Sequence, residues 1–219
     1  TNLNWYDAQD PRPDYYKYLP SYFVDDPQMM ASVTQNWQNN DPNTTQLNWD
    51  GMYNANYKNL YTVIDPNGAQ GTTLTENRSK YIVEEYRLDP RQFGVNSIYN
   101  HKYNDFLNLT VGINIDRYTS HNYKLMDDLL GGDFWIDVDQ FAEQDFEDQT
   151  VAQNDLQNTN NIIREGDRFG YDYNIHVNKN SLFSQIEGKF KKFDFYVGLT
   201  KSITQFHRVG NMQNGRFPE

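Results

Sequence analysis

The stretch FLNLTVGINIDRY, residues 106–118, decides the fold class because apolar and polar side chains alternate along it from Leu107 to Asp116. Its apolar side consists of Leu107, Leu109, Val111, Ile113 and Ile115, and its polar side of Asn108, Thr110, Gly112, Asn114 and Asp116. A second stretch, FDFYVGLTKSITQF at 193–206, repeats the pattern with Phe193, Phe195, Val197, Leu199 and Ile203, which alternate with polar residues that include Asp194 and Thr200. This period of two predicts β-strands with one apolar and one polar face.

Each of these strands has a less regular partner on its N-terminal side. YIVEEYRLDPRQFGVNSIYNHK, residues 81–102, predicts a strand that is broken or bulged near Pro90. FGYDYNIHVNKNSLFSQIEG, residues 169–188, changes its apolar phase midway, which predicts a bulge between Asn178 and Ser181. Tight turns at 101–105 and 189–192 would close two hairpins, and long segments separate and precede them.

Short turns that alternate with long loops are typical of outer-membrane β-barrels, in which apolar side chains face lipid and polar ones face the lumen. The same alternation also fits an antiparallel sheet whose apolar side packs on the core of a soluble protein. The pattern alone leaves both interpretations open.

The segment before the first hairpin has helical rather than alternating character. DDPQMMASVTQNW, residues 25–37, predicts a short helix capped by Asp26, with Pro27 in its first turn and Met30, Val33 and Trp37 on one side. NWDGMYNANYKNLY, residues 48–61, predicts a second one, and DPNGAQGTT, residues 65–73, predicts a turn.

The charge of the chain excludes one class of partner. The formal net charge is -11, and residues 125–163 contain ten acidic residues and no Lys or Arg. Such a chain is a poor ligand for a phosphate backbone, so we expect no nucleic-acid partner. The sequence contains no Cys and no long apolar run that would predict a transmembrane helix.

Motifs of catalysis are also missing from the sequence. The four histidines (His101, His121, His176 and His207) form no H-E-x-x-H arrangement, and no G-x-S-x-G elbow or glycine-rich phosphate loop occurs. We therefore expect a protein that is not an enzyme and has no cofactor.

Three long motifs carry a resemblance to a known family. They are NWYDAQDPRPDYYKYLPSYF (residues 4–23), LLGGDFWIDVDQFAEQDF (129–146) and GDRFGYDYN (166–174). In content, order and spacing they resemble segments of TonB-dependent outer-membrane receptors of the Bacteroidota type. The resemblance implies an all-β fold: about four antiparallel strands of a transmembrane β-barrel, with long extracellular loops that contain short helices. It also implies that the chain is an internal segment of that barrel.

The same resemblance implies a location and a set of partners. The segment would lie in the bacterial outer membrane with its loops outside, and would take part in energy-coupled uptake of a ligand bound by those loops. Its partners would be its own plug domain, the remaining barrel strands, the TonB complex, lipid and lipopolysaccharide, and a surface substrate-binding lipoprotein. The alternative is a soluble β-rich module that binds a carbohydrate or another ligand.

On this interpretation one barrel domain has five parts. Residues 1–78 form an extracellular loop region with short helices, 79–119 a β-hairpin, and 120–170 a long acidic extracellular loop. Residues 171–208 form a second hairpin, and 209–219 begin the next loop.

Two sets of residues in the expected loops are candidates for binding. Aromatic rings stack on flat ligands and sugars, or else pack the loops, and this set comprises Trp5, Tyr6, Tyr15, Tyr16, Trp49 and Trp135. The acidic loop offers Asp133, Asp137 and Asp139 as oxygen ligands for calcium, without the spacing of an EF-hand. The competing interpretation of these acids is a short helix capped by Asp137, with Val138, Phe141 and Ala142 turned inward.

Overall fold

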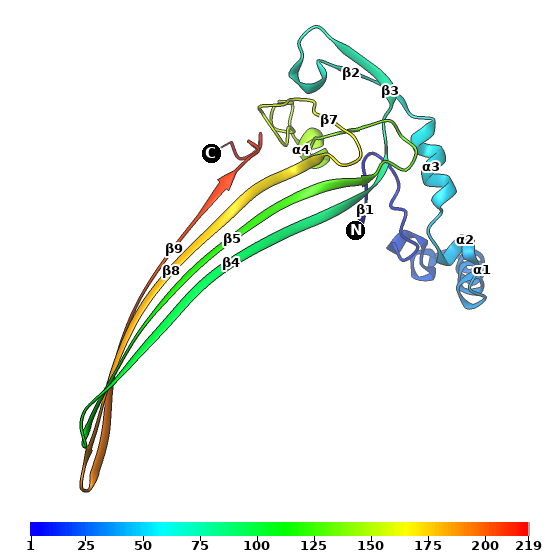
Figure 1. Ribbon diagram of the computed structural model, residues 1–219. Helices are drawn as coiled ribbons and strands as arrows, with labels where there is room; N and C mark the ends of the chain where they lie inside the picture. The colour runs from blue at the N-terminus through cyan, green and yellow to red at the C-terminus, as the bar shows by residue number, and fades with distance from the viewer. Residues whose placement is uncertain (219) are drawn as a thin grey trace. The chain divides into compact units, whose positions relative to one another are not determined.

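The computed structural model describes residues 1–218 and shows a β-rich protein, with 50% of the chain in strands. Five strands form one antiparallel sheet in the order β1-β4-β5-β8-β9 (Figure 1). Their bounds are β1 Asn2–Trp5, β4 Tyr81–Asn104, β5 Leu107–Asp128, β8 Arg168–Phe190 and β9 Phe193–Gly210. Within residues 1–218 the sheet does not close into a barrel, since β1 and β9 lie at its two edges.

The remaining elements are short. Two small antiparallel sheets pair β2 (Leu60–Ile64) with β3 (Thr73–Asn77), and β6 (Trp135–Ile136) with β7 (Ile162–Ile163). The α-helices are α1 Pro27–Gln38, α2 Pro42–Thr45, α3 Trp49–Tyr57 and α4 Gln140–Asp145. Three 3-10 turns are η1 Tyr16–Tyr18, η2 Pro20–Phe23 and η3 Pro66–Gly68. No helix within residues 1–218 combines the length and apolar character needed to cross a bilayer.

The chain divides into two compact units. The first unit comprises Thr1–Tyr86, Lys124–Gly170 and the residues from Gln213 on, and thus holds all the helices. The second unit comprises Arg87–Tyr123 and Tyr171–Met212, which are the turn-proximal parts of β4, β5 and β8 together with β9.

The two strands with strict alternation are confirmed, and three details differ from the prediction. β4 runs through Pro90 as one uninterrupted strand, and β5 continues past residue 119 to Asp128, so the acidic segment begins later than expected. The bulge predicted between Asn178 and Ser181 is wrong for the β8–β9 pair, because their register is unbroken from Tyr173↔Gly210 to Phe190↔Phe193. The phase of the apolar residues changes because they move from one face of a regular strand to the other.

The predicted helices are largely confirmed. Asp26 caps α1 by accepting a hydrogen bond from the Met29 N–H at 3.0 Å, and Pro27 is its first residue. Asn48 caps α3 in the same way through the Gly51 N–H at 2.9 Å. The helix expected to reach residue 61 ends at Tyr57, and the chain then enters β2, which the helical pattern had concealed.

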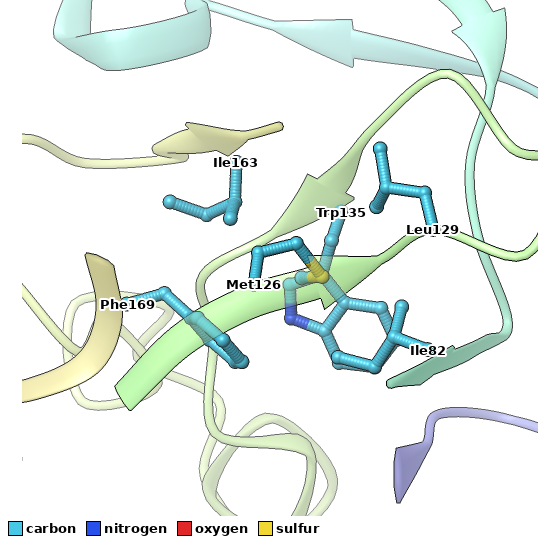
Figure 2. Close-up of a cluster of buried hydrophobic side chains, with 6 residues drawn as sticks. All are labelled: Ile82, Met126, Leu129, Trp135, Ile163 and Phe169. Carbon is cyan, nitrogen blue, oxygen red and sulfur yellow. The ribbon is translucent and has the colours of Figure 1, made fainter. Parts of the chain in front are cut away.

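The first unit has its own hydrophobic core. Figure 2 shows the six side chains of this core, in which Trp135 packs with Ile82, Met126, Leu129, Ile163 and Phe169. A second cluster joins Val63 of β2 to Phe134 and Ile136. These contacts fix the long loop after β5 against the start of β4 and of β8, and thereby position the cleft described next.

Candidate binding cleft and apolar sheet face

A cleft of about 520 Å³ lies in the first unit, between the aromatic segment at residues 4–23 (the opening segment) and the helices α1, α2 and α3. Its apolar lining includes Tyr18, Phe23, Val33, Met52 and Tyr81. Its polar lining consists of Gln9, Asp10, Asn43, Thr44, Gln46 and Asn48. A concave site of this size with aromatic walls and a few convergent amides has the general character of a small-ligand site.

Two tyrosine hydroxyls hold the opening segment in place as one wall of the cleft. The Tyr18 hydroxyl donates to the Asp10 carbonyl at 2.9 Å, and the Tyr81 hydroxyl donates to the Gln9 carbonyl at 2.9 Å. The chain enters this wall from β1, which pairs with β4 from Asn2↔Glu84 to Trp5↔Tyr81. The N-terminal part of the wall is therefore tied to β4, and the Tyr18 hydrogen bond closes the wall on itself.

The only acidic group of the lining is already neutralised by a neighbour. Asp10 accepts from the Arg12 backbone N–H at 3.0 Å and from the Arg12 Nε–H at 2.9 Å. The side-chain hydrogen bond from Arg12 is the main cause that holds the pKa of Asp10 below its usual value. Since no Lys or Arg lines the cleft, its surface is close to electrically neutral and suits an uncharged polar ligand.

A buried asparagine attaches α3, the floor of the cleft, to the rest of the unit. The Asn56 side chain is fully buried, and its amide nitrogen lies 2.7 Å from the Tyr81 carbonyl and 2.9 Å from the Leu129 carbonyl. Its carbonyl oxygen accepts from the backbone N–H groups of Lys80 at 2.7 Å and Tyr81 at 3.0 Å. This one side chain therefore satisfies backbone groups from two segments that are far apart in sequence.

The aromatic residues predicted to bind ligand lie outside the cleft lining. Trp5 lies under the Arg12 guanidinium, whose Cζ is 5.3 Å from the ring centroid, and the Tyr15 and Tyr16 rings contact each other edge to face at 4.7 Å. Trp49 is exposed at the start of α3. Their role in ligand binding stays a prediction.

Tyr6 and Trp135 are brought together, with their ring centroids 6.0 Å apart. Trp135 is 4% exposed, so its ring contributes to packing and presents no open stacking surface in this structure. Tyr6 also lies against Arg78, whose guanidinium sits 4.1 Å from the Tyr6 ring centroid and 5.0 Å from that of Tyr61. Burial lowers the pKa of Arg78, and the two π faces offset part of the cost of burying its charge.

The three candidate calcium ligands are each engaged separately. An Asp133 oxygen accepts from the Asn77 backbone N–H at 2.8 Å, and Asp139 caps α4 through the Phe141 N–H at 2.9 Å. Asp137 is buried and accepts from the Gly170 N–H at 2.8 Å. No group of three or more potential ligands arranged for a metal occurs within residues 1–218.

The alternative prediction for the acidic loop is partly wrong. A helix does form, but its cap is Asp139 instead of Asp137, and Phe141 is 65% exposed while Ala142 is buried. Asp137 turns inward because Gly170 and Asn154 supply donors to it, the latter through Nδ2 at 2.8 Å. Desolvation is the main cause that raises the pKa of Asp137 to about 6.

The sequence did not predict the lining of the cleft, and several of the lining residues come from the motif at residues 4–23. Tyr18, Phe23 and Asp10 were inside that stretch, and its three prolines would have been the signal that its backbone turns back to form a wall. Asn48 and Tyr81 carried no such signal, because they lie at the ends of a helix and a strand.

The second unit presents a different feature, an extended apolar face. In the β8–β9 pair, Phe190 lies opposite Phe193, Ile186 opposite Val197 and Ser184 opposite Leu199. Side chains directly opposite in an antiparallel pair point to the same face. These apolar residues are largely exposed, at 76% for Phe193 and 73% for Leu199.

Contacts on the other side of the sheet show which residues of β4 and β5 share a face with those of β8 and β9. A Cβ at Gly112 would meet the Phe183 ring, and the Thr110 hydroxyl donates to the Asn100 side-chain oxygen at 2.8 Å. The even-numbered residues of β4 and β5 therefore share the face of the odd-numbered residues of β8. By alternation, the opposite face then carries most of the apolar residues of the four strands, whereas Ile98, Phe183 and Tyr196 lie on the polar face.

We call that opposite face of the second unit the apolar face. It comprises Phe93, Val95, Tyr99 and Tyr103 of β4; Leu107, Leu109, Val111, Ile113 and Ile115 of β5; Leu182, Ile186 and Phe190 of β8; and Phe193, Phe195, Val197, Leu199 and Ile203 of β9. The polar face carries Thr110, Asn114, Asp194 and Thr200, as the alternation had predicted.

The apolar face has a polar boundary at the end away from the turns. His176 lies opposite His207, with the two rings stacked at 4.8 Å, and the Thr119 hydroxyl is 3.2 Å from the His176 Nδ1. One pair nearer the turn, the apolar residues Val177 and Phe206 already lie on the other face. The apolar face is therefore a band of limited height.

Neither a scan of protein-family models nor a search of curated protein sequences found a match for the chain.

Proposed function

We propose that this chain supplies strands and extracellular loops to the transmembrane β-barrel of a TonB-dependent outer-membrane receptor, and that the cleft captures the ligand to be taken up. The observation that carries the proposal is the apolar face: a band of mostly apolar side chains across four strands, interrupted on β9 by Lys201, opposite a face that is mostly polar. In a barrel these two faces would contact lipid and lumen respectively.

The height of the band supports this assignment. On β9 it runs from Phe193 to Ile203, and about eleven residues at about 3.3 Å each, tilted by about 45°, rise about 25 Å. That height matches the apolar band of outer-membrane barrels, which is about 25 Å tall. The strands of 18 to 24 residues are longer than a bilayer requires, so they would project beyond it.

Closure of such a barrel needs further strands. β9 pairs only with β8 within residues 1–218, and an unpaired strand edge cannot face hydrocarbon. We propose that flanking parts of the same polypeptide provide these strands, together with the plug that the resemblance implies.

The alternative of a soluble binding module accounts for the cleft equally well but not for the apolar face. Burial of apolar surface is the main driving force for the folding of a soluble domain. Phe193, Leu199 and Val197 instead remain 65% to 76% exposed. The apolar face therefore favours the membrane protein over the soluble module.

The proposal is tested by moving one charge between the two faces. Val197→Arg puts a cation on the apolar face, while Thr200→Arg puts it on the polar face of the same strand. In the full-length protein, the first should disfavour membrane assembly by about 2–4 kcal/mol, since that is the cost of a midplane cation. Outer-membrane fractions would be compared for folded, protease-resistant protein. Equal assembly of the two variants would refute the proposal.

Capture of ligand by the cleft has its own test. Thr44→Trp would fill part of the cleft, and Gln38→Trp places the same ring on exposed surface at the end of α1, outside the lining. We expect the first variant to assemble normally and to lose ligand uptake, and the second to retain both. Normal uptake by Thr44→Trp would exclude the cleft as the capture site.

A further inference from the structure

The two hairpin turns of the second unit meet in a groove of about 550 Å³. Its lining consists of Phe106, Lys189, Phe190, Lys191, Lys192 and Phe193. The Lys189 N–H donates to the Phe106 carbonyl at 2.8 Å, and the Phe106 and Phe190 ring centroids are 5.2 Å apart. The groove is thus built jointly by the β4–β5 turn and the β8–β9 turn.

The apolar part of this groove continues the apolar face. Phe193 lies opposite Phe190 at the last pair of the β8–β9 ladder, and both rings are exposed, as is Phe106. Phe190 also stacks on Phe195. Phe195 lies opposite Gly188, and this pair is the next one along the same face. Aromatic rings at the end of a lipid-facing band occupy the interface between acyl chains and headgroups.

The charged part of the groove is a pair of lysines at the tip of the hairpin. Lys191 and Lys192 are the two central residues of the turn, and Lys191 has a φ of 31°. Asn fits position 191 better than Lys does, because Asn tolerates a positive φ. The sequence therefore keeps a cation at 191 although the backbone conformation there favours another residue.

Neighbouring acidic residues form no ion pair with these two lysines within residues 1–218. In the other turn, Asp105 is bound to Lys102 at 2.8 Å, and Asp194 lies opposite Lys189. Within the described part of the chain neither Lys191 nor Lys192 forms an ion pair. Two free cations beside three phenylalanine rings are complementary to an amphiphile with an anionic headgroup and an acyl chain.

We propose that this groove binds an anionic phospholipid of the leaflet at the turn side, with the phosphate at Lys191 and Lys192 and the acyl chain along the three rings. The proposal rests on the membrane assignment above and deepens it, since it fixes which lipid the wall selects. A free inorganic anion would use the lysines but leave the exposed rings uncovered.

The test uses a variant that removes both charges without straining the turn. In Lys191→Asn/Lys192→Gly, Asn tolerates the positive φ of residue 191 and Gly adopts either sign of φ, and Lys191→Arg/Lys192→Arg keeps the charge. Lys17→Asn/Lys58→Asn removes the same charge from the first unit as a control. The full-length protein is reconstituted in nanodiscs of phosphatidylglycerol and phosphatidylcholine, and the retained lipids are counted by native mass spectrometry.

We expect the wild type, the arginine variant and the control to retain phosphatidylglycerol preferentially. Each lysine near an anionic surface contributes about fivefold, so the Asn-Gly variant should lose about 25-fold of this preference. Insertion with equal retention in the wild type and the Asn-Gly variant would overturn the lipid site, and would leave an acidic protein partner as the occupant to consider.

A second measurement separates this proposal from the membrane assignment. If the wild type fails to insert, its cosedimentation with phosphatidylglycerol vesicles is compared with that of the Asn-Gly variant. Sedimentation that only the wild type shows would retain the lipid site and reject the barrel. Sedimentation of neither, or of both equally, would reject the lipid site as well.

Discussion

The two units of this molecule use apolar side chains in opposite ways. In the first unit Phe134 and Ile82 are fully buried, and polar groups such as Asn56 and Asp137 are buried with their hydrogen-bond partners. In the second unit Phe193 and Leu199 are more than 70% exposed. The difference indicates that the first unit folds around its own core, whereas the second leaves large apolar side chains uncovered.

The largest expected effect comes from truncating one phenylalanine in each unit. Phe134→Ala removes a side chain from the cluster with Val63 and Ile136, and should lower the free energy of unfolding by about 3–5 kcal/mol. Phe193→Ala removes an exposed ring and should change it by less than about 0.5 kcal/mol in denaturant titrations. Similar losses in both would contradict the comparison.

The next effect is a pH dependence confined to the first unit. The folded-state pKa of Asp137, about 6, lies above the ordinary value of 3.8, so between these values the folded state binds the extra proton. The free energy of unfolding should therefore fall by about 3 kcal/mol as the pH rises from about 4 to about 6, and then level off. Asp137→Asn should abolish this slope in unfolding curves measured across that range. A wild-type stability that rises over the same range would contradict the assignment.

Asn56 tests whether buried polar groups hold the first unit together. Asn56→Ala removes the Asn56 partner of the Lys80 and Tyr81 N–H groups and of the Tyr81 carbonyl, at an expected cost of about 2–3 kcal/mol. Amide hydrogen exchange should accelerate at Lys80 and Tyr81. Exposed Asn54, on the same helix, is the matched control, and Asn54→Ala should leave exchange unchanged.

The smallest effect distinguishes two glycines on the polar face of the second unit. A Cβ at Gly112 would lie 2.0 Å from the Phe183 ring, whereas the nearest atom to one at Gly198 is 3.9 Å away. Gly112→Ala should thus cost about 1–3 kcal/mol, and Gly198→Ala should be neutral or slightly stabilising. Thermal unfolding of the protein in detergent would compare the two, and equal shifts would indicate that Phe183 moves aside without cost.

Sequence reasoning succeeded where the determinants were local. The alternation along Leu107–Ile115 and the Asp26-Pro27 start of α1 each depend on neighbours within a few residues. It failed where burial depends on distant partners. Nothing near Asp137 announces that Gly170 will supply its hydrogen bond, and the β2 strand was hidden because Val63 is its only buried residue.

The apolar face depends on local sequence, whereas the cleft depends on contacts between distant segments. The alternation gave the apolar residues of β5 and β9 directly, but the cleft combines Gln9, Asn48 and Tyr81 from three separate segments. Their convergence results from the β1–β4 pairing and from Asn56, and neither is visible as a pattern along the chain.

The unbroken β8–β9 register also bears on how such proteins change over evolutionary time. Because every residue from Tyr173 to Phe190 faces its partner without a bulge, the hairpin carries a complete inside-and-outside pattern and its own turn. If this hairpin were duplicated or lost, the side chains of every neighbouring strand would still point to the same faces of the sheet. In the barrel that we propose, a gene could therefore change the width of the pore two strands at a time, without redesigning any strand that remains.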